Sequence, residues 1–192
     1  MKQQAYQLLA DILDYPNPAM PFSVQRLVFL LQEEEPRAAA AMAEFQSVLE
    51  TAGIARFQEL YIQTFDFRAD CSLYVGHYLF GESGRRGLFL AELSERYRER
   101  QLAAISDIPD HMSCLLRYLA ALEPGEEAAE LIHGCLIPAI SRVIAADAIA
   151  KSPYRVVLEA LLVLLQRKDS GYPELGEFAW TSSSSSHFPI LP

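Results

Sequence analysis

The sequence has little of what an enzyme, a metal protein or a disulfide-stabilised protein needs. It holds three cysteines in 192 residues, at wide spacing and odd in number, so no disulfide framework can be inferred. It contains no phosphate-binding glycine loop, dinucleotide glycine fingerprint, nucleophile elbow, HExxH motif or paired CxxC motif. The nearest metal-like spacings, His111 with Cys114 and His133 with Cys135, do not reproduce a zinc pattern and favour core cysteines. We therefore expect no catalytic residue, no cofactor and no metal ion.

Signals for export and for a membrane span are also missing. The first sixteen residues carry two aspartates where a signal peptide needs an unbroken apolar stretch. The apolar runs at 27–31 and 160–165 are far shorter than the ~20 residues that cross a bilayer. The net charge of −9 opposes binding to nucleic acid and to anionic lipid. These features predict a cytoplasmic protein without a nucleic-acid partner or stable membrane insertion.

What the sequence does contain is helical spacing almost throughout. A content of 51% hydrophobic and 21% charged residues is typical of a folded globule. Apolar residues recur at helical intervals, and the turn signals of β-hairpins are missing. We predict an all-α fold, a single compact domain of about nine helices over residues 1–170. Residues 171–192 include a run of serines and are expected to form a disordered tail.

Prolines, glycines and serines predict where the helices begin and end. Pro16 should end the first helix, Pro36 should open a helix that Gly53 closes, and Pro138 should kink a helix that begins near Pro124. The predicted helices are therefore 22–32, 36–49, 54–65, 73–80 with Ser72 as N-cap and Gly81 as terminator, 84–102, one starting at Pro109-Asp110, 124–149, and 154–167 opened by Ser152-Pro153.

Two stretches place acids beside aromatic residues and suggest a binding surface. They are Glu59–Phe67, which runs on to His77, and Asp107–His111. Asp66, between two phenylalanines, is either a helix-capping residue or an acid offered to a partner. The imidazole of His77 is either a half-buried structural group or one that faces a ligand.

Acidic residues are concentrated between positions 104 and 135. This segment holds six acids and a single base, Arg117. An acidic rim beside apolar grooves would suit a partner that presents an amphipathic helix with basic residues. A solvated face explains the same charge equally well.

Several of these residues, in order and spacing, resemble a known protein family. The motifs are Tyr61 through Phe65-Asp66-Phe67, Ser72-Leu73-Tyr74 with His77, Gly81, Arg86-Gly87 and Pro109-Asp110. They resemble the signature of the NarJ-type assembly chaperones of respiratory nitrate reductase, within the TorD/DmsD group of redox-enzyme maturation proteins. The resemblance covers roughly residues 8–122. One departure is His111, since Pro-Asp-His looks more like the TorD/DmsD branch.

The resemblance implies a helical cytoplasmic chaperone rather than an enzyme. Such a protein binds the N-terminal segment of a molybdenum enzyme's catalytic subunit, related to a twin-arginine leader, and keeps that subunit open until its cofactor is inserted. Contacts with cofactor-delivery proteins and a monomer or homodimer are further implications. Alternatives are a chaperone for another exported molybdoenzyme, and a nucleotide-binding protein or enzyme.

We expect the peptide site to combine aromatic side chains for apolar contact with acids and histidines for polar contact, and Arg86 to brace the loop. The site residues expected are Tyr61, Phe65, Asp66, Tyr74, His77, Arg86, Asp107, Asp110 and His111.

Overall fold

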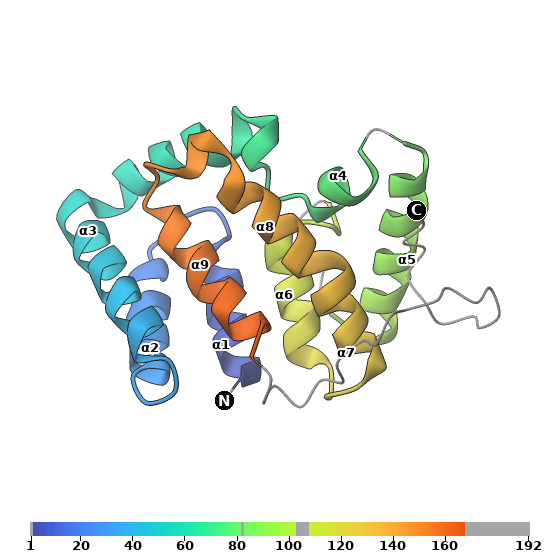
Figure 1. The fold of residues 1–192 in the computed structure, drawn as a ribbon, viewed down its shortest axis with the longest axis horizontal. Helices are drawn as coiled ribbons and strands as arrows, with labels where there is room; N and C mark the ends of the chain where they lie inside the picture. The colour runs from blue at the N-terminus through green and yellow to red at the C-terminus, as the bar shows by residue number, and fades with distance from the viewer. Residues whose placement is uncertain (1, 82, 103–107, 168–192) are drawn as a thin grey trace.

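A computed structural model describes residues 2–81, 83–102 and 108–167 of the chain (Figure 1). Helices make up its regular structure, and no strand occurs among the described residues, which confirms the predicted all-α fold. The elements are α1 (Lys2–Ile12), α2 (Met20–Leu31), α3 (Pro36–Tyr61), π-helix η1 (Ile62–Asp66), 3-10 helix η2 (Ala69–Cys71), α4 (Val75–Phe80), α5 (Arg85–Glu99), α6 (Met112–Ala121), α7 (Glu126–Glu130), π-helix η3 (Leu131–Leu136), α8 (Ile137–Ala145), 3-10 helix η4 (Asp147–Ile149) and α9 (Tyr154–Leu165).

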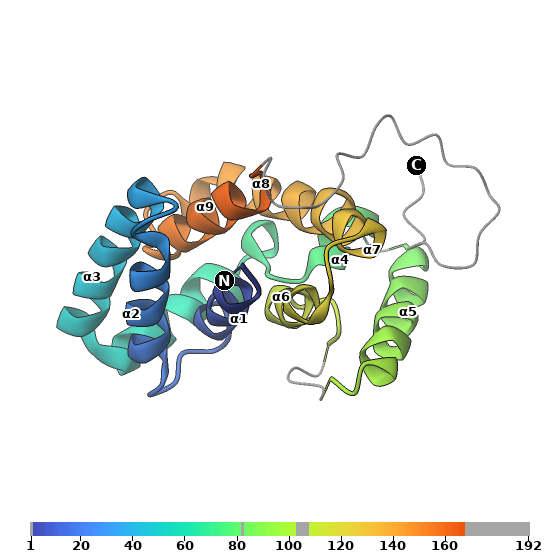
Figure 2. The ribbon, with the colours of Figure 1, turned by 90° about the horizontal axis from the view of Figure 1, so that it is seen from below.

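The helices are arranged around a central pair, α1 and α6. Helix α1 packs against α6 and α2, and α2 packs against α3. Helices α8 and α9 cover one side of the central pair, while α4 and α5 lie at the end opposite to α2 and α3 (Figures 1 and 2). The core includes the fully buried side chains Leu9, Ile12, Leu115 and Leu161. The expected tail, residues 171–192, lies outside the described residues.

The break predicted at Gly53 is present as a kink inside one long helix. Pro36 stands in the first turn of α3, as predicted, and α3 continues to Tyr61. Gly53 has φ +78° and ψ 164°, a combination that side chains with a Cβ almost never adopt. The kink changes the direction of the helix, so that its second half carries Phe57 and Tyr61 into the core.

Two predicted helix caps differ from the structure, and α6 and α7 begin at Met112 and Glu126, two residues later than predicted. Ser72 is not the N-cap of α4, which begins three residues later at Val75, and its hydroxyl accepts a hydrogen bond from the Tyr74 amide instead (3.3 Å). At α9 the Ser152 hydroxyl accepts from the Tyr154 amide at 3.4 Å, with Pro153 at the N-cap. Helices α5 and α9 are also shorter than predicted and end at Glu99 and Leu165.

Helices α7 and α8 form one continuous helix, Glu126–Ala145, with the π-helical turn η3 between them. Pro138, where a kink is predicted, stands in the first turn of α8, directly after this π-helical turn. By length and composition alone this helix could cross a membrane, although the sequence suggested no such stretch. In its most apolar window, 56% of the residues are buried inside the fold, and buried core helices pass the same test.

The acids between 104 and 135 do not form an unpaired rim. Glu127 binds Arg96 (3.0 Å) and Arg100 and accepts a hydrogen bond from the Tyr118 hydroxyl, and Glu130 is buried. Arg117, the single base of this segment, binds Asp11 and Asp14 on the α1 side. Asp110, Glu127 and Glu130 are therefore bound or buried within the fold and do not form the expected rim, whereas Glu123 and Glu126 are exposed. Asp107 lies outside the described residues.

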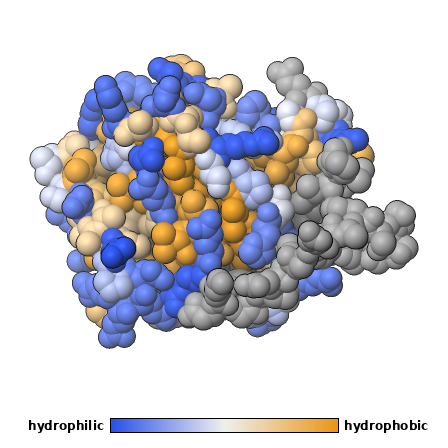
Figure 3. All heavy atoms as spheres, viewed as in Figure 1, coloured by the Kyte–Doolittle hydropathy of each residue, from blue (hydrophilic) through white to orange (hydrophobic). Residues whose placement is uncertain are grey.

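Apolar side chains remain at the surface on the side of α8 and α9. Figure 3 shows them as a band between these two helices, bordered by hydrophilic residues. Val163 on α9 is 42% exposed, and Leu162 and Ile137 are partly buried beside the core.

The backbone at Gly53 gives a test of the fold. A Cβ at Gly53 meets no neighbouring atom, so Gly53→Ala changes only the backbone strain, which we expect to cost about 1–3 kcal/mol of unfolding free energy. Gly84→Ala is the matched control, because Gly84 has φ −58° and the same open surroundings. Urea unfolding should show the loss only at Gly53; equal effects would contradict the assigned conformation.

Candidate functional site

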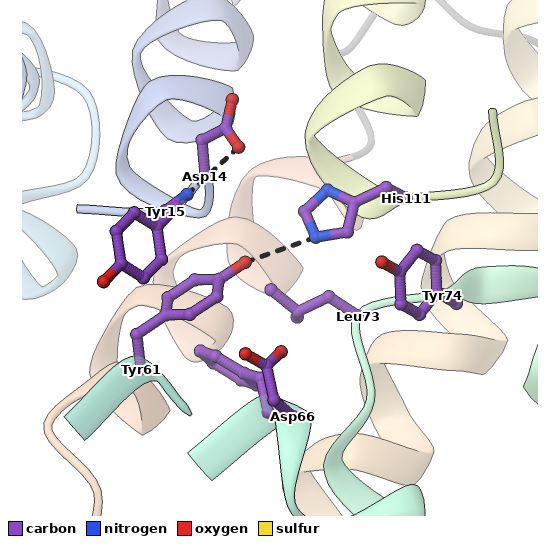
Figure 4. Close-up of a pocket in the computed structure, with 8 residues that line it drawn as sticks. Asp14, Tyr15, Tyr61, Asp66, Leu73, Tyr74 and His111 are labelled. Carbon is purple, nitrogen blue, oxygen red and sulfur yellow. Dashed lines mark hydrogen bonds between the residues drawn. The ribbon is translucent and has the colours of Figure 1, made fainter. Parts of the chain in front are cut away.

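A pocket of about 210 Å³ lies where four separate segments meet. They are the link between α1 and α2, the end of α3 with η1, the segment before α4, and the start of α6 (Figure 4). The lining side chains are Asp14, Tyr15, Tyr61, Phe65, Asp66, Leu73, Tyr74 and His111. Four of the eight lining residues are thus Tyr or Phe, and two carboxylates supply the charge of the pocket.

The link between α1 and α2 is held in place by side chains of α3. Pro16 and Pro18 prevent α1 from continuing. The Gln58 side chain donates to the Pro16 carbonyl (2.9 Å), and the Tyr61 hydroxyl donates to the Leu13 carbonyl (3.2 Å). These two bonds flank Asp14 and Tyr15 and fix their position in the wall of the pocket.

The π-helical turn η1 separates a buried ring from an open acid. Its wider turn is closed by a hydrogen bond from the Phe67 amide to the Ile62 carbonyl (3.2 Å). Phe65 is buried, Asp66 is exposed with its carboxylate directed to the pocket, and Phe67 is 78% exposed (Figure 4). Single π turns inside α-helices occur frequently at functional sites.

His111 connects the pocket to the start of α6. Its Nδ1 accepts from the Ser113 amide (3.3 Å) and lies 2.7 Å from the Ser113 hydroxyl. Nδ1 therefore carries no proton, and Nε2 is the donor to the Tyr61 hydroxyl at 3.3 Å. Burial, aided by Arg117, lowers the His111 pKa against the opposite effects of Asp14 and Asp110. The imidazole is thus held neutral, as a capping acceptor on one side and a donor on the other.

Asp110 is fully buried and supports the pocket from behind. Its carboxylate accepts from the Gly76 amide (3.0 Å), from Arg86 Nε (2.9 Å) and from Arg86 Nη2 (3.2 Å). Its backbone carbonyl accepts from the Val75 amide (2.9 Å). Asp110 therefore satisfies the first two amides of α4, which has no side-chain cap of its own.

The wall of the pocket also has a rigid aromatic base. Tyr154 is fully buried and packs edge-on against Tyr61 and Phe65, with ring centroids 5.8 and 5.1 Å apart. Tyr15 packs edge-on against Tyr61 at 5.7 Å and is 47% exposed. Burial raises the pKa of Tyr61 far above its ordinary value, so its hydroxyl stays protonated.

The structure brings five of the expected site residues together in the pocket. These are Tyr61, Phe65, Asp66, Tyr74 and His111. Three of the other expected residues, His77, Arg86 and Asp110, lie outside its lining, and Asp107 falls outside the described residues.

Asp110 is bound within the fold, whereas His77 is half-buried, as in the structural alternative predicted for it. Direct contact of the Asp110 carboxylate with a peptide is corrected, because both its oxygens are buried and bound within the fold. His77 lies on α4 with its ring edge-on to Tyr78 at 5.2 Å. Arg86 pairs with Asp110 and lies over the Tyr74 ring, 5.8 Å from its centroid.

Sequence reasoning missed three residues of the pocket, Asp14, Tyr15 and Leu73. A signal was available for the first two. Asp14-Tyr15 repeats the acid-beside-aromatic pairing that marked the Phe65–Phe67 stretch, and it stands before Pro16, where a helix must end.

This arrangement can bind but offers little for catalysis. No group of three histidine, cysteine or acidic side chains able to hold a metal ion occurs in the described part of the chain. The His111 imidazole is engaged with a tyrosine whose hydroxyl is protonated and bound to a carbonyl. A concave site with aromatic walls and a few polar groups is typical of ligand and peptide recognition.

Comparisons with known proteins give a consistent result. A family model described as nitrate reductase delta subunit matches residues 32–146. The chain is 29% identical over 161 residues to the nitrate reductase molybdenum cofactor assembly chaperone NarJ of Escherichia coli K12, covering 82% of this chain and 67% of NarJ. It is 26% identical over 124 residues to the probable NarJ of Bacillus subtilis strain 168, covering 64% and 67% respectively.

A further similar protein is much longer than this chain. The nitrate reductase-like protein NarX of Mycobacterium tuberculosis H37Rv is 26% identical over 134 residues, which cover 69% of this chain but 20% of NarX. The chain therefore corresponds to about a fifth of that relative.

The pairing of Asp110 with Arg86 predicts an unequal response to mutation. Arg86→Ala leaves a fully buried carboxylate without its cation, which should cost about 3 kcal/mol of unfolding free energy. Arg56→Ala is the control, since Arg56 and Glu59 form an exposed pair worth about 0–1 kcal/mol. Urea unfolding at neutral pH compares the two variants, and similar losses would rule out a supporting role for Asp110.

The neutral state of His111 predicts a pH effect on stability. The unfolded histidine titrates near 6.5 and the folded one lower, so below pH 6.5 the unfolded chain binds more protons and stability falls. His111→Asn keeps a capping acceptor without a titrating group. Between pH 7.5 and 5.5 the wild type should lose more unfolding free energy than His111→Asn in urea unfolding. Parallel losses in both proteins would contradict the assignment.

Proposed function

This chain belongs to the nitrate reductase delta subunit family, and from that membership we propose that it is an assembly chaperone for a nitrate reductase. In this role it binds the N-terminal segment of the catalytic subunit and keeps that subunit competent for insertion of the molybdenum cofactor. Two relatives carry the chaperone name NarJ. These relatives favour a nitrate reductase as the client, over the alternative that His111 suggested, a different exported molybdoenzyme.

The observation that carries the proposal is the pocket itself. It combines buried rings that are already packed with two exposed lining residues, Tyr15 and Asp66. The residue that follows Asp66, Phe67, is 78% exposed. An exposed phenylalanine beside an exposed acid contributes little to the stability of the free protein. Both side chains can be buried when a partner segment binds. Rigid rings also bind with a small loss of side-chain entropy.

The proposed action is physical rather than catalytic. A chaperone that binds a segment only while it is accessible stabilises the form of the client in which that segment is free. The client is thereby biased towards its open state without any bond being made or broken.

The location and assembly of the protein are part of the same proposal. We place the chaperone in the cytoplasm, where a catalytic subunit receives its cofactor before assembly, and we expect a monomer or homodimer. Contacts with the proteins that deliver the cofactor belong to the same role.

The proposal is tested with a synthetic peptide of the first residues of a nitrate reductase catalytic subunit. Calorimetry should show one site per chain, and Phe67→Ala should weaken binding about tenfold because an aromatic anchor is lost. Phe67 is 78% exposed, so its removal leaves the core intact.

Phe22→Ala is the matched control for this experiment. Phe22 is 62% exposed on α2, and neither it nor its chain neighbours line the pocket, whereas Phe67 directly follows the lining residue Asp66. Loss of Phe22 should therefore leave the affinity unchanged. Failure of the peptide to bind the wild-type protein, or equal effects of the two variants, would refute the proposal.

A further inference from the structure

We infer that the pocket receives a guanidinium group, the side chain of an arginine in the bound segment, and that Asp66 is its carboxylate partner. This inference rests on the proposed function and names the chemistry by which the segment is recognised. It is carried by the charge of the pocket, by the surroundings of Asp66, and by an arginine site of the same composition within this molecule.

The charge around the pocket is unbalanced. Asp14 accepts the Tyr15 amide (3.0 Å) and lies 3.2 Å from Arg117, which also binds Asp11. Arg117 thus serves two acids, while no described residue makes a hydrogen bond or ion pair with the Asp66 carboxylate. His111 is neutral and contributes no positive charge. A cation that enters meets net negative charge and one carboxylate that no residue in the described part of the chain binds.

The surroundings of Asp66 increase the value of a cationic partner. Although the residue as a whole is exposed, its carboxylate points towards Tyr61 and Leu73 inside the pocket (Figure 4). Partial burial there raises the Asp66 pKa, which means that the carboxylate is less well solvated than on an open surface. A bound cation would offset that loss of solvation.

The walls suit a planar cation better than a compact one. Rings of Tyr15, Tyr61 and Tyr74 line the pocket, and guanidinium groups stack on aromatic faces and bind carboxylates through two parallel donors. A volume of about 210 Å³ is several times the ~30 Å³ share of one water molecule. It therefore has room for the head group of a long side chain.

The same combination is already used once in this protein. Arg86 lies over the Tyr74 ring, 5.8 Å from its centroid, and binds both oxygens of Asp110. One planar cation, one ring and one carboxylate thus form a stable arrangement beside the pocket. The pocket offers rings and the carboxylate of Asp66, and it lacks only the arginine.

The test exchanges arginine for citrulline, which has the same shape and no charge. Each arginine of the catalytic-subunit peptide is replaced singly, and affinities for wild type and Asp66→Asn are measured by calorimetry. One replacement should weaken binding to the wild type about tenfold and leave binding to Asp66→Asn unchanged. Asp70→Asn, an exposed acid outside the pocket, should behave like the wild type.

Other outcomes overturn the inference. It is wrong if every citrulline peptide binds like the parent, if Asp66→Asn binds the parent as tightly as the wild type does, or if lysine replaces the critical arginine without loss. In those cases the peptide still binds, so the proposed function stands.

A second probe separates failure of the inference from failure of the proposed function. N-acetyl-arginine amide should shift the amide signals of Asp66, Tyr15 and Tyr74 in NMR titrations, in a saturable manner. N-acetyl-citrulline amide should not, and Asp66→Asn should abolish the shifts. If no catalytic-subunit peptide binds, the proposed function fails, and this titration alone decides whether the pocket takes a guanidinium.

Discussion

The buried carboxylate of Asp110 is the interaction on which the candidate site depends. It joins the start of α4 to α5 through Gly76 and Arg86, and its own backbone pairs with the segment that carries Tyr74. A Cβ at Gly76 would lie 2.5 Å from that carboxylate, so only glycine permits the approach. A charge this deeply buried is tolerated because every oxygen has a donor. The result is a fixed distance between Tyr74 and His111, whose rings lie 5.3 Å apart.

The positions of these side chains matter because no single helix defines the pocket. Tyr61 contacts His111 across 50 residues and Leu13 across 48, so the pocket exists only when its four segments are packed together. The side chains of such a site lose their conformational entropy when the protein folds, so little more is lost when a ligand binds. The neutral His111 continues the same design, since its two nitrogens tie α6 to Tyr61 without placing a positive charge where a cation is to bind.

The parts of this architecture that depend on local chemistry could be predicted from the sequence. Pro36 starts α3, Gly53 interrupts it and Gly81 ends α4, because each effect comes from the backbone of one residue. The Ser72 cap was wrong because its place is taken by Asp110, 34 residues away from the amide it binds. Contacts between residues far apart in the sequence also decide the roles of the acids at the site. A sequence marks Asp66 and Asp110 as acids near aromatics, but burial alone distinguishes the open carboxylate from the structural one.

The different roles of Asp110 and Asp66 suit a protein that releases its partner. Asp110 and Arg86 hold the walls through a buried pair, which is costly to disturb. Asp66 and Phe67 are exposed residues outside this buried pair, and only a few side chains contribute strongly to affinity in a typical interface. Most differences in affinity between related complexes appear in the dissociation rate. A preformed pocket with few exposed anchors therefore permits rapid recognition and ready release, as the proposed chaperone needs once its client closes.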